Sequence, residues 1–236
     1  MLYNGLIMAD LHWGAIDPSK FAIEINNTIM ATIGDYDLAA DRGDEINLDF
    51  IVICGDLFDS KEYLNSDVTS HVLRFIKLLY ESTERFNTEI LIIEGTRGHD
   101  SLQTKALEII FNFLSDYERI HFFPTVQSYD IGKLHCLMIP EEYVADQDEY
   151  YKPYFEGHKY DLIFGHGMTD MMWYAKKNEF LTLNHAQSAP IFSVDQLCEI
   201  GNYIFFGHVH VKKEYGKDDR FHSIGALTRW EFGNGI

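Results

Sequence analysis

The stretch FIVICGDLFD, residues 50–59, joins five consecutive apolar residues to a glycine and two aspartates. A short apolar run without polar alternation is typical of a strand buried on both faces of a sheet. Similar runs recur along the chain, at LIMAD (6–10), EILIIEG (89–95), LHCLMIP (134–140), DLIFGHG (161–167) and YIFFGHVH (203–210). These runs predict the strands of a central sheet.

Longer amphipathic stretches alternate with these strands. Apolar residues recur at helical spacing in three of them, 18–35, 67–86 and 101–117. Pro18 suits a first helical turn, and Ser66 or Asp67 can cap the second helix. The series predicts an α/β protein with helices packed on central sheets. From about Ile131 strands outnumber helices, so a mixed sheet or two facing sheets is expected in place of one parallel sheet.

The 236 residues are predicted to form a single domain, because no Pro/Ser-rich or low-complexity stretch interrupts the apolar pattern. No separate capping domain is expected. The three cysteines lie far apart without a CxxC pair, which is typical of free thiols in a reducing compartment. Without a signal-like or long apolar segment, the chain is expected in the cytoplasm with no membrane partner. A homodimer is one assembly that the sequence leaves open.

Acidic residues dominate the charge, with 37 Asp and Glu against 19 Lys and Arg and a formal charge of -18. This balance argues against a domain that coats nucleic acid through bulk electrostatics. A polyanionic substrate would have to be held locally, for example by bound cations. Much of the acid lies in residues 35–49 and 141–150. Such runs are usually solvated loops, and a partner-binding surface is the alternative.

Side chains that ligate metals follow five of the predicted strands. They are Asp10 and His12, Asp56 and Asp59, His99 and Asp100, His166, and His208 and His210. Loops that leave the carboxyl ends of strands converge on one crevice, so these groups are expected to meet. Carboxylate and imidazole without thiolate suit Mn, Fe or Zn. Preceding glycines, such as Gly55 and Gly207, let the backbone turn sharply or lie close to the site.

Five motifs, DLHWG, GDLFD, GTRGHD, GHG and GHVH, together resemble the calcineurin-like metallophosphoesterases (DxH, GDxxD, GNHD, GH, GHxH) over residues 10–210. The segment FHSIGALTRWEFGNG (221–235) is similar to the YxGSxxRxxFGE segment that closes the nuclease domain of SbcD-type DNA repair nucleases. The resemblance implies a layered metallophosphoesterase fold and two divalent ions, Mn first, with Fe, Zn or Mg as alternatives. It also implies a DNA substrate and an SbcC/Rad-fifty-like ATPase subunit as partner.

The resemblance assigns a ligand role to six residues. The ligands of one ion would be Asp10, His12 and His210. His166 and His208 would belong to the second ion, and Asp56 would bridge both. Asp59 would be a supporting carboxylate behind the ligands, with a simple helix N-cap as the alternative.

The resemblance also assigns the proton chemistry. His99 would face the scissile phosphate, where it would stabilise charge or protonate the leaving oxygen, and Asp100 would orient His99. The family carries Asn before this histidine, whereas this chain carries Gly98. Either Thr96 or a backbone carbonyl replaces the amide ligand, or the second ion is bound more weakly or lost. Arg97 could contact phosphate or could be an ordinary surface arginine.

The leading hypothesis is therefore an Mn-dependent DNA exo- or endonuclease of DNA repair and recombination. Trp13 and Trp173 are expected to be exposed and to stack on bases, which favours this hypothesis. The alternative is a phosphodiesterase or phosphatase for a small nucleotide, a phosphoprotein or another phosphate ester, which the shortness of the chain favours. A third hypothesis, motivated by Gly98, is a degenerate metal-binding scaffold without turnover.

Overall fold

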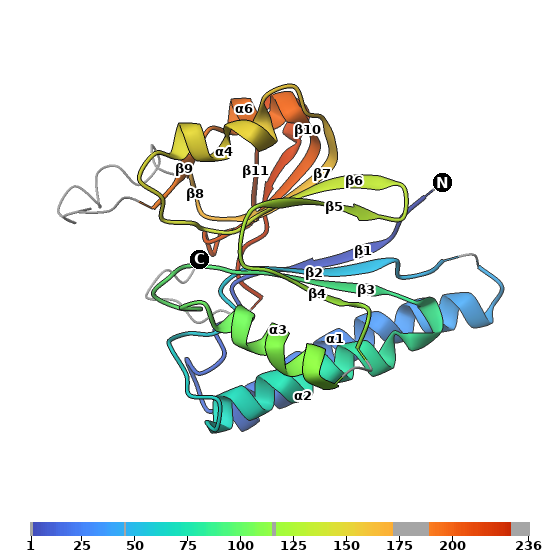
Figure 1. Ribbon diagram of the computed structural model, residues 1–236. Helices are drawn as coiled ribbons and strands as arrows, with labels where there is room; N and C mark the ends of the chain where they lie inside the picture. The colour runs from blue at the N-terminus through green and yellow to red at the C-terminus, as the bar shows by residue number, and fades with distance from the viewer. Residues whose placement is uncertain (1, 45, 115–116, 172–188, 228–236) are drawn as a thin grey trace.

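Two β-sheets stacked face to face form the centre of the protein, and helices cover both outer faces (Figure 1). The computed structural model describes residues 2–44, 46–114, 117–171 and 189–227. The first sheet has the strand order β1-β2-β3-β4 and is parallel throughout. Its strands are β1 (Gly5–Met8), β2 (Phe50–Cys54), β3 (Glu89–Ile93) and β4 (Ile120–Phe123).

The second sheet is mixed, with the order β11-β12-β10-β7-β6-β5. Its strands are β5 (Gln127–Ile131), β6 (Leu134–Ile139), β7 (Tyr160–His166), β10 (Gly201–Gly207), β11 (Lys213–Tyr215) and β12 (Phe221–Ser223). The outer strands β5 and β11 run antiparallel to their neighbours, and the inner pairs are parallel. A short parallel pair, β8 (Met168–Thr169) and β9 (Ile191–Phe192), lies apart from it. The predicted α/β class with mixed sheets is thus confirmed.

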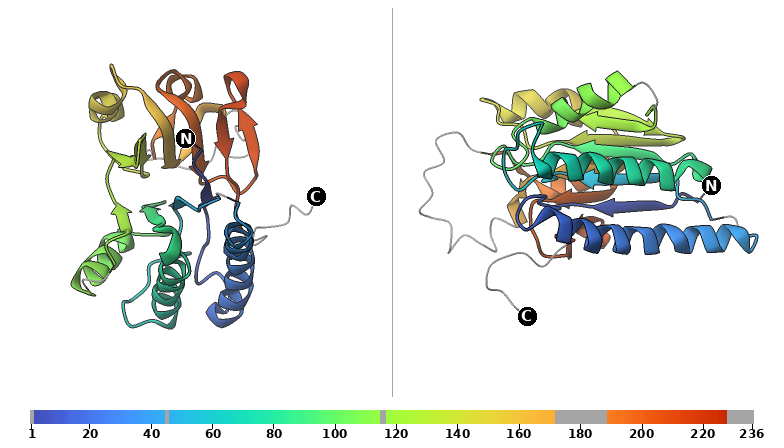
Figure 2. Two further views of the ribbon diagram at one scale, coloured as in Figure 1. Left: turned by 90° about the vertical axis from the view of Figure 1, so that its right-hand side faces the viewer. Right: turned by 90° about the horizontal axis from the view of Figure 1, so that it is seen from below.

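Three helices lie side by side on the outer face of the first sheet, as Figure 2 shows. They are α1 (Pro18–Asp41), α2 (Asp67–Ser82) and α3 (Gln103–Leu114), and a 3-10 turn, η1 (Glu84–Phe86), follows α2. The second sheet is covered by α4 (Gln147–Phe155) and α6 (Val194–Ile200), and η2 (Lys217–Asp219) precedes β12. Ser66 is the N-cap of α2, because its side chain accepts a hydrogen bond from the Thr69 N–H.

Two acidic stretches are more ordered than the sequence predicted. Residues 35–41 form the last turns of α1, and residues 147–150 begin α4. The interpretation of 35–49 and 141–150 as solvated loops is therefore wrong for these parts. In α4 the acidic side chains lie on a helix whose Tyr151 and Phe155 are buried against the second sheet. A few apolar anchors were enough to hold a helix that its composition did not reveal.

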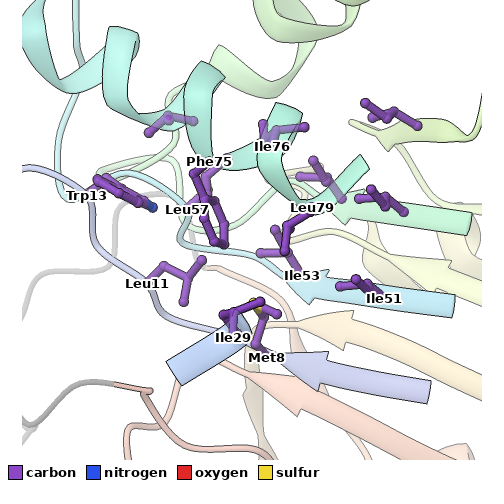
Figure 3. Close-up of a cluster of buried hydrophobic side chains, with 14 of the residues drawn as sticks. Met8, Leu11, Trp13, Ile29, Ile51, Ile53, Leu57, Phe75, Ile76 and Leu79 are labelled. Carbon is purple, nitrogen blue, oxygen red and sulfur yellow. The ribbon is translucent and has the colours of Figure 1, made fainter. Parts of the chain in front are cut away.

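Trp13 lies in the core between the first sheet and its helices (Figure 3), where its side chain is 0% exposed. Its ring packs edge-on against Phe21, with the centroids 4.5 Å apart. The expectation that Trp13 is exposed for base stacking is therefore wrong. The reason is strand-like pairing beyond β1, in which the Trp13 N–H donates to Leu57 O and Trp13 O accepts from the Asp59 N–H. Trp173 lies outside the described residues.

Apolar side chains also fill the space between the two sheets. Val52 and Cys54 of β2 pack in one cluster with Met138 and Phe164 of the second sheet. The three cysteines are buried and free, as predicted. Within the described ranges, none of the helices combines the length and the apolar character needed to cross a bilayer. The packed sandwich fixes where the loops at the strand ends meet.

Candidate metal centre

The predicted metal ligands converge at one edge of the sandwich, on loops that follow strands of both sheets. The structure groups them in three overlapping sets of nearby ligand atoms, each within 4.8 Å: Asp10, His12 and His210; His12, Asp56 and His99; and Asp56, His166 and His208. The first and third sets are the ones that the resemblance assigns to two separate ions. Buried histidine and carboxylate groups that could hold a metal ion are therefore present.

The first set is held by backbone and side chain together. His12 Nε2 lies 3.1 Å from His210 Nε2, and His210 Nε2 lies 3.5 Å from Asp10 Oδ1. Both carboxylate oxygens of Asp10 also accept from the His208 N–H, at 3.0 and 3.1 Å. Two imidazole nitrogens and a carboxylate oxygen thus face one another in a buried setting. This is a donor set that a divalent transition metal accepts.

Asp56 lies between the two sets. Its Oδ2 is 3.9 Å from His12 Nε2, whereas its Oδ1 is 3.2 Å from His166 Nε2. The Thr96 N–H donates to Oδ1 at 2.6 Å and fixes the carboxylate. One carboxylate that reaches both sets has the arrangement of a bridging ligand.

His166 is fully buried, and its hydrogen bonds define its ligand atom. Its Nδ1 lies 2.8 Å from Cys54 O, and a carbonyl can only accept, so Nδ1 carries the hydrogen. In the neutral ring the lone pair is then on Nε2, which faces Asp56 and Thr96. Metal-bound histidines commonly donate their other ring N–H to a carbonyl in this way. Nε2 is therefore the nitrogen through which His166 could bind a metal ion.

Glu141, which the sequence analysis placed in a solvated acidic run, is a buried member of the site. Its side chain is only 1% exposed, and Oε2 lies 3.2 Å from His208 Nδ1. The residue follows β6, a strand whose Ile139 pairs with Gly165 of β7, so it emerges beside His166. A glutamate directly after a buried strand was the signal in the sequence, and the neighbouring acidic residues obscured it.

Thr96, and not Gly98, lies at the second set, where the resembling family has its Asn ligand. Its hydroxyl lies 3.2 to 3.3 Å from Asp56 Oδ2, Glu141 Oε2, His166 Nε2 and His208 Nδ1. Gly98 is exposed, and a Cβ there would meet nothing within 4 Å. Gly98, which the motif aligns with the family's Asn, therefore lies away from the second set, whereas Thr96, one of the substitutes considered for that amide, lies at it. The two extra residues of GTRGHD carry Gly98 out of the site and leave Thr96 in it.

Strained backbone marks the site. The φ angles of Asp10, His12, Asp56 and His208 are 53°, 48°, 49° and 86°, all in the left-handed region. Such conformations cost non-glycine residues on the order of 1–2 kcal/mol each and persist where the surrounding structure enforces them. Gly55 has φ of 76°, and a Cβ there would lie 2.3 Å from the His166 ring. These loops therefore adopt unfavourable backbone conformations that direct their side chains toward one point.

His99 lies beside the first set, with its ring centroid 4.6 Å from that of His12. Its Nδ1 donates to the carbonyl of Asp59, so this backbone group sets the ring's orientation. Asp100 instead accepts from the Phe58 and Gly95 N–H groups, at 2.9 and 2.8 Å. Asp100 thus ties together the loops after β2 and β3, and its predicted role of orienting His99 stays a prediction.

Two further predicted residues lie at the margin. The Asp59 side chain is 39% exposed, and its Oδ1 lies 3.6 Å from His12 Nδ1, behind the ligand nitrogen. Asp59 is thus near His12 but beyond hydrogen-bond distance of it, and its supporting role stays a prediction. Arg97 is exposed, and its guanidinium lies 5.8 Å from the centre of the Tyr143 ring.

The electrostatics of the site are those of a cation pocket. Burial alone would raise the pKa of Asp56, but His166 and its hydrogen bond lower that pKa well below the usual range. Burial would lower the pKa of His166, but Asp56 raises it well above its ordinary value. The pKa of Glu141 is lowered despite burial, because His208 bonds to it. The charge of a buried carboxylate has to be balanced, either by a proton or by a metal ion. In this site a bound metal ion could take the place of the protons.

Comparisons with known proteins give no family assignment. No protein-family model matches the chain, and a search of curated proteins finds no match.

Proposed function

We propose that this chain is a metal-dependent phosphodiester hydrolase that acts on DNA, an exo- or endonuclease similar to the SbcD type. The observation that carries the proposal is Asp56, which reaches both His12 in one ligand set and His166 in the other. Mn²⁺ is the proposed metal, because the donors are carboxylate and imidazole without thiolate. Fe, Zn and Mg are the alternatives.

The position of each residue in the ligand sets indicates its proposed role. Asp10, His12 and His210 would hold one ion, and His166 and His208 the other, with Asp56 between them. When bound, two such ions would supply Lewis-acid chemistry, which activates water and offsets the negative charge of a phosphate. They would also supply the local positive charge that a chain of formal charge -18 otherwise lacks.

His99 is the proposed group for proton transfer. Because its Nδ1–H is engaged by the Asp59 carbonyl, Nε2 is the nitrogen that can hold a proton and pass it to the leaving oxygen. The ring is only partly buried, so substrate can approach it. Asp100 would hold the two supporting loops at a fixed distance through its bonds to Phe58 and Gly95. Arg97 is the proposed phosphate contact at the rim.

The choice of DNA rests on the similarity of residues 221–235 to the segment that closes SbcD-type nuclease domains. An SbcC/Rad-fifty-like ATPase would then be the partner that supplies DNA affinity. One observation favours the alternative, a hydrolase of small phosphate esters. The burial of Trp13 removes one of the two aromatic side chains expected to stack on bases.

Parallel assays with Mn²⁺ separate these functions. The substrates are linear duplex DNA, single-stranded DNA and p-nitrophenyl phosphodiesters. DNA degradation that His99→Ala lowers by about 10²–10⁴-fold supports the nuclease. The matched control is His135→Ala, because His135 pairs with exposed Asp130 on β5. Ester turnover without DNA cleavage supports the alternative, and silence on every substrate contradicts both.

A further inference from the structure

We propose that Glu141 is an anionic ligand of the second cation, in a role that the resembling family gives to an amide. This inference rests on the proposed function, since it concerns the same metal centre.

The topology places Glu141 at the site. β6 and β7 are parallel neighbours, with Met138 opposite Phe164 and Ile139 opposite Gly165. The chain leaves β6 through Pro140 at the same edge at which β7 ends in His166. Glu141 is 5% exposed as a whole residue, which is rare for glutamate. A buried carboxylate here requires a positive partner or a metal.

Hydrogen bonds distinguish the two oxygens of Glu141. Oε1 accepts from the Tyr143 hydroxyl at 2.6 Å. Oε2 faces the set, at 3.2 Å from both His208 Nδ1 and Thr96 Oγ1. Outer hydrogen bonds of this kind orient the ligating atom of a carboxylate. Tyr143 thus presents Oε2 to the cluster.

The spacing of the donors fits a shared ion. The distances of 3.2 Å from Glu141 Oε2 to His208 and from His166 Nε2 to Asp56 Oδ1 are nearly equal. Ligands about 2.1 Å from one ion stand roughly 3.0 to 3.4 Å apart when they subtend roughly 90 to 109° at it. The Thr96 hydroxyl lies 3.2 to 3.3 Å from an oxygen or nitrogen of each of these four residues, so Glu141 faces the same point as Asp56, His166 and His208.

The carboxylate changes the properties of the second position. Glu141 and Asp56 together would give it two anionic oxygens beside the two imidazoles of His166 and His208. An amide contributes no charge, so a carboxylate holds a divalent ion more tightly. Oxygen-rich sets also shift preference toward Mn²⁺ and Mg²⁺ and away from softer metals. The chain would thereby retain the second ion without the family's Asn.

The test is Mn²⁺ binding to metal-free protein, measured by isothermal titration calorimetry without nucleic acid. Two ions per wild-type chain are expected. Glu141→Gln should keep the first ion and lose at least about tenfold in affinity for the second. Glu142→Gln is the matched control. Glu142 accepts hydrogen bonds from the Val126 N–H and the Tyr150 hydroxyl, so this variant should bind both Mn²⁺ ions as the wild type does.

Each outcome decides the inference. Wild-type binding of both ions by Glu141→Gln would overturn it, as would a wild-type chain that takes up fewer than two ions. Circular dichroism verifies that Glu141→Gln folds. If it does not fold, Glu141→Asp decides, since the shortened side chain should also weaken the second ion about tenfold. A chain that shows the expected loss but cleaves no phosphodiester refutes the proposed function and leaves the ligand role intact.

Discussion

Asp56 Oδ1 lies 3.2 Å from His166 Nε2, and both side chains are almost completely buried. The two residues come from the ends of strands in different sheets, β2 and β7. Their contact is thus one of the points at which loops of the two sheets meet in the site, together with the contacts of His12 with His210 and of Asp10 with His208. Because Asp56 also approaches His12 in the other set, the behaviour of this carboxylate tests the whole centre.

Asp56→Asn should remove the bridging charge while it retains the shape of the side chain. We expect the affinity for Mn²⁺ to fall by more than about 100-fold, since changes even behind metal ligands cost 10- to 100-fold. Equilibrium dialysis with metal-free protein measures this loss. Asp161→Asn is the control. Asp161, near the start of β7, accepts a hydrogen bond from the His135 N–H and belongs to none of the three ligand sets. Equal Mn²⁺ affinity in the two variants would contradict the bridging role.

Metal binding should release protons. The pKa of His166 is raised well above its ordinary value by Asp56, so the metal-free ring keeps its second proton to a higher pH than an ordinary histidine does. A histidine ligates only when neutral, so each bound ion at this position displaces that proton. The affinity should therefore rise with pH until the raised pKa is passed, and fall in acid. Calorimetry in buffers of different ionisation enthalpy counts the protons, and pH-independent affinity would count against His166 as a ligand.

Gly55→Ala should destabilise the protein, because an added Cβ would strain the backbone beside the metal centre. The added Cβ would lie 2.3 Å from the His166 ring, at a φ of 76° that alanine tolerates poorly. We expect the free energy of unfolding of the metal-free protein to fall by about 1–3 kcal/mol. Gly34→Ala in α1 meets nothing within 4 Å and should instead stabilise the protein by up to about 1 kcal/mol. Urea unfolding of both variants measures the contrast, and equal effects would contradict the close approach.

Trp13→Ala should lower the free energy of unfolding and should have no direct effect on substrate binding. The ring is fully buried against Phe21 and Phe75, so its removal should cost about 3–5 kcal/mol. Trp13→Phe, which retains most of the apolar volume, should cost less. Thermal unfolding and DNA binding, measured on Trp13→Phe, separate the two roles. A large loss of DNA binding in this variant with unchanged stability would contradict the core assignment.

Much of the centre could be predicted from sequence because the proposed ligands lie in strands or within four residues of strand ends. Asp56, His166 and His208 follow glycine after short apolar runs, and such ends converge by topology alone. The predicted strands at 50–56 and 203–210 likewise correspond to β2 and β10.

The remaining features depend on contacts that a single sequence does not display. Whether Glu141 is solvated or buried depends on the register between β6 and β7. Which face Trp13 takes depends on the pairing of its loop with the loop after β2. The spacing of GTRGHD suggested Gly98 as the aligned position, whereas the path of the loop brings Thr96 to the ligands. Local patterns specify elements, and tertiary pairing decides which side chains face the site.

Anomalous diffraction at the Mn absorption edge, from a crystal grown with Mn²⁺, tests the central claim most directly. The account predicts two peaks per chain, one beside Asp10, His12 and His210 and the other beside His166 and His208, with Asp56 in contact with both. A crystal with no peak at this edge of the sandwich, or with ions bound away from Asp56, would contradict it.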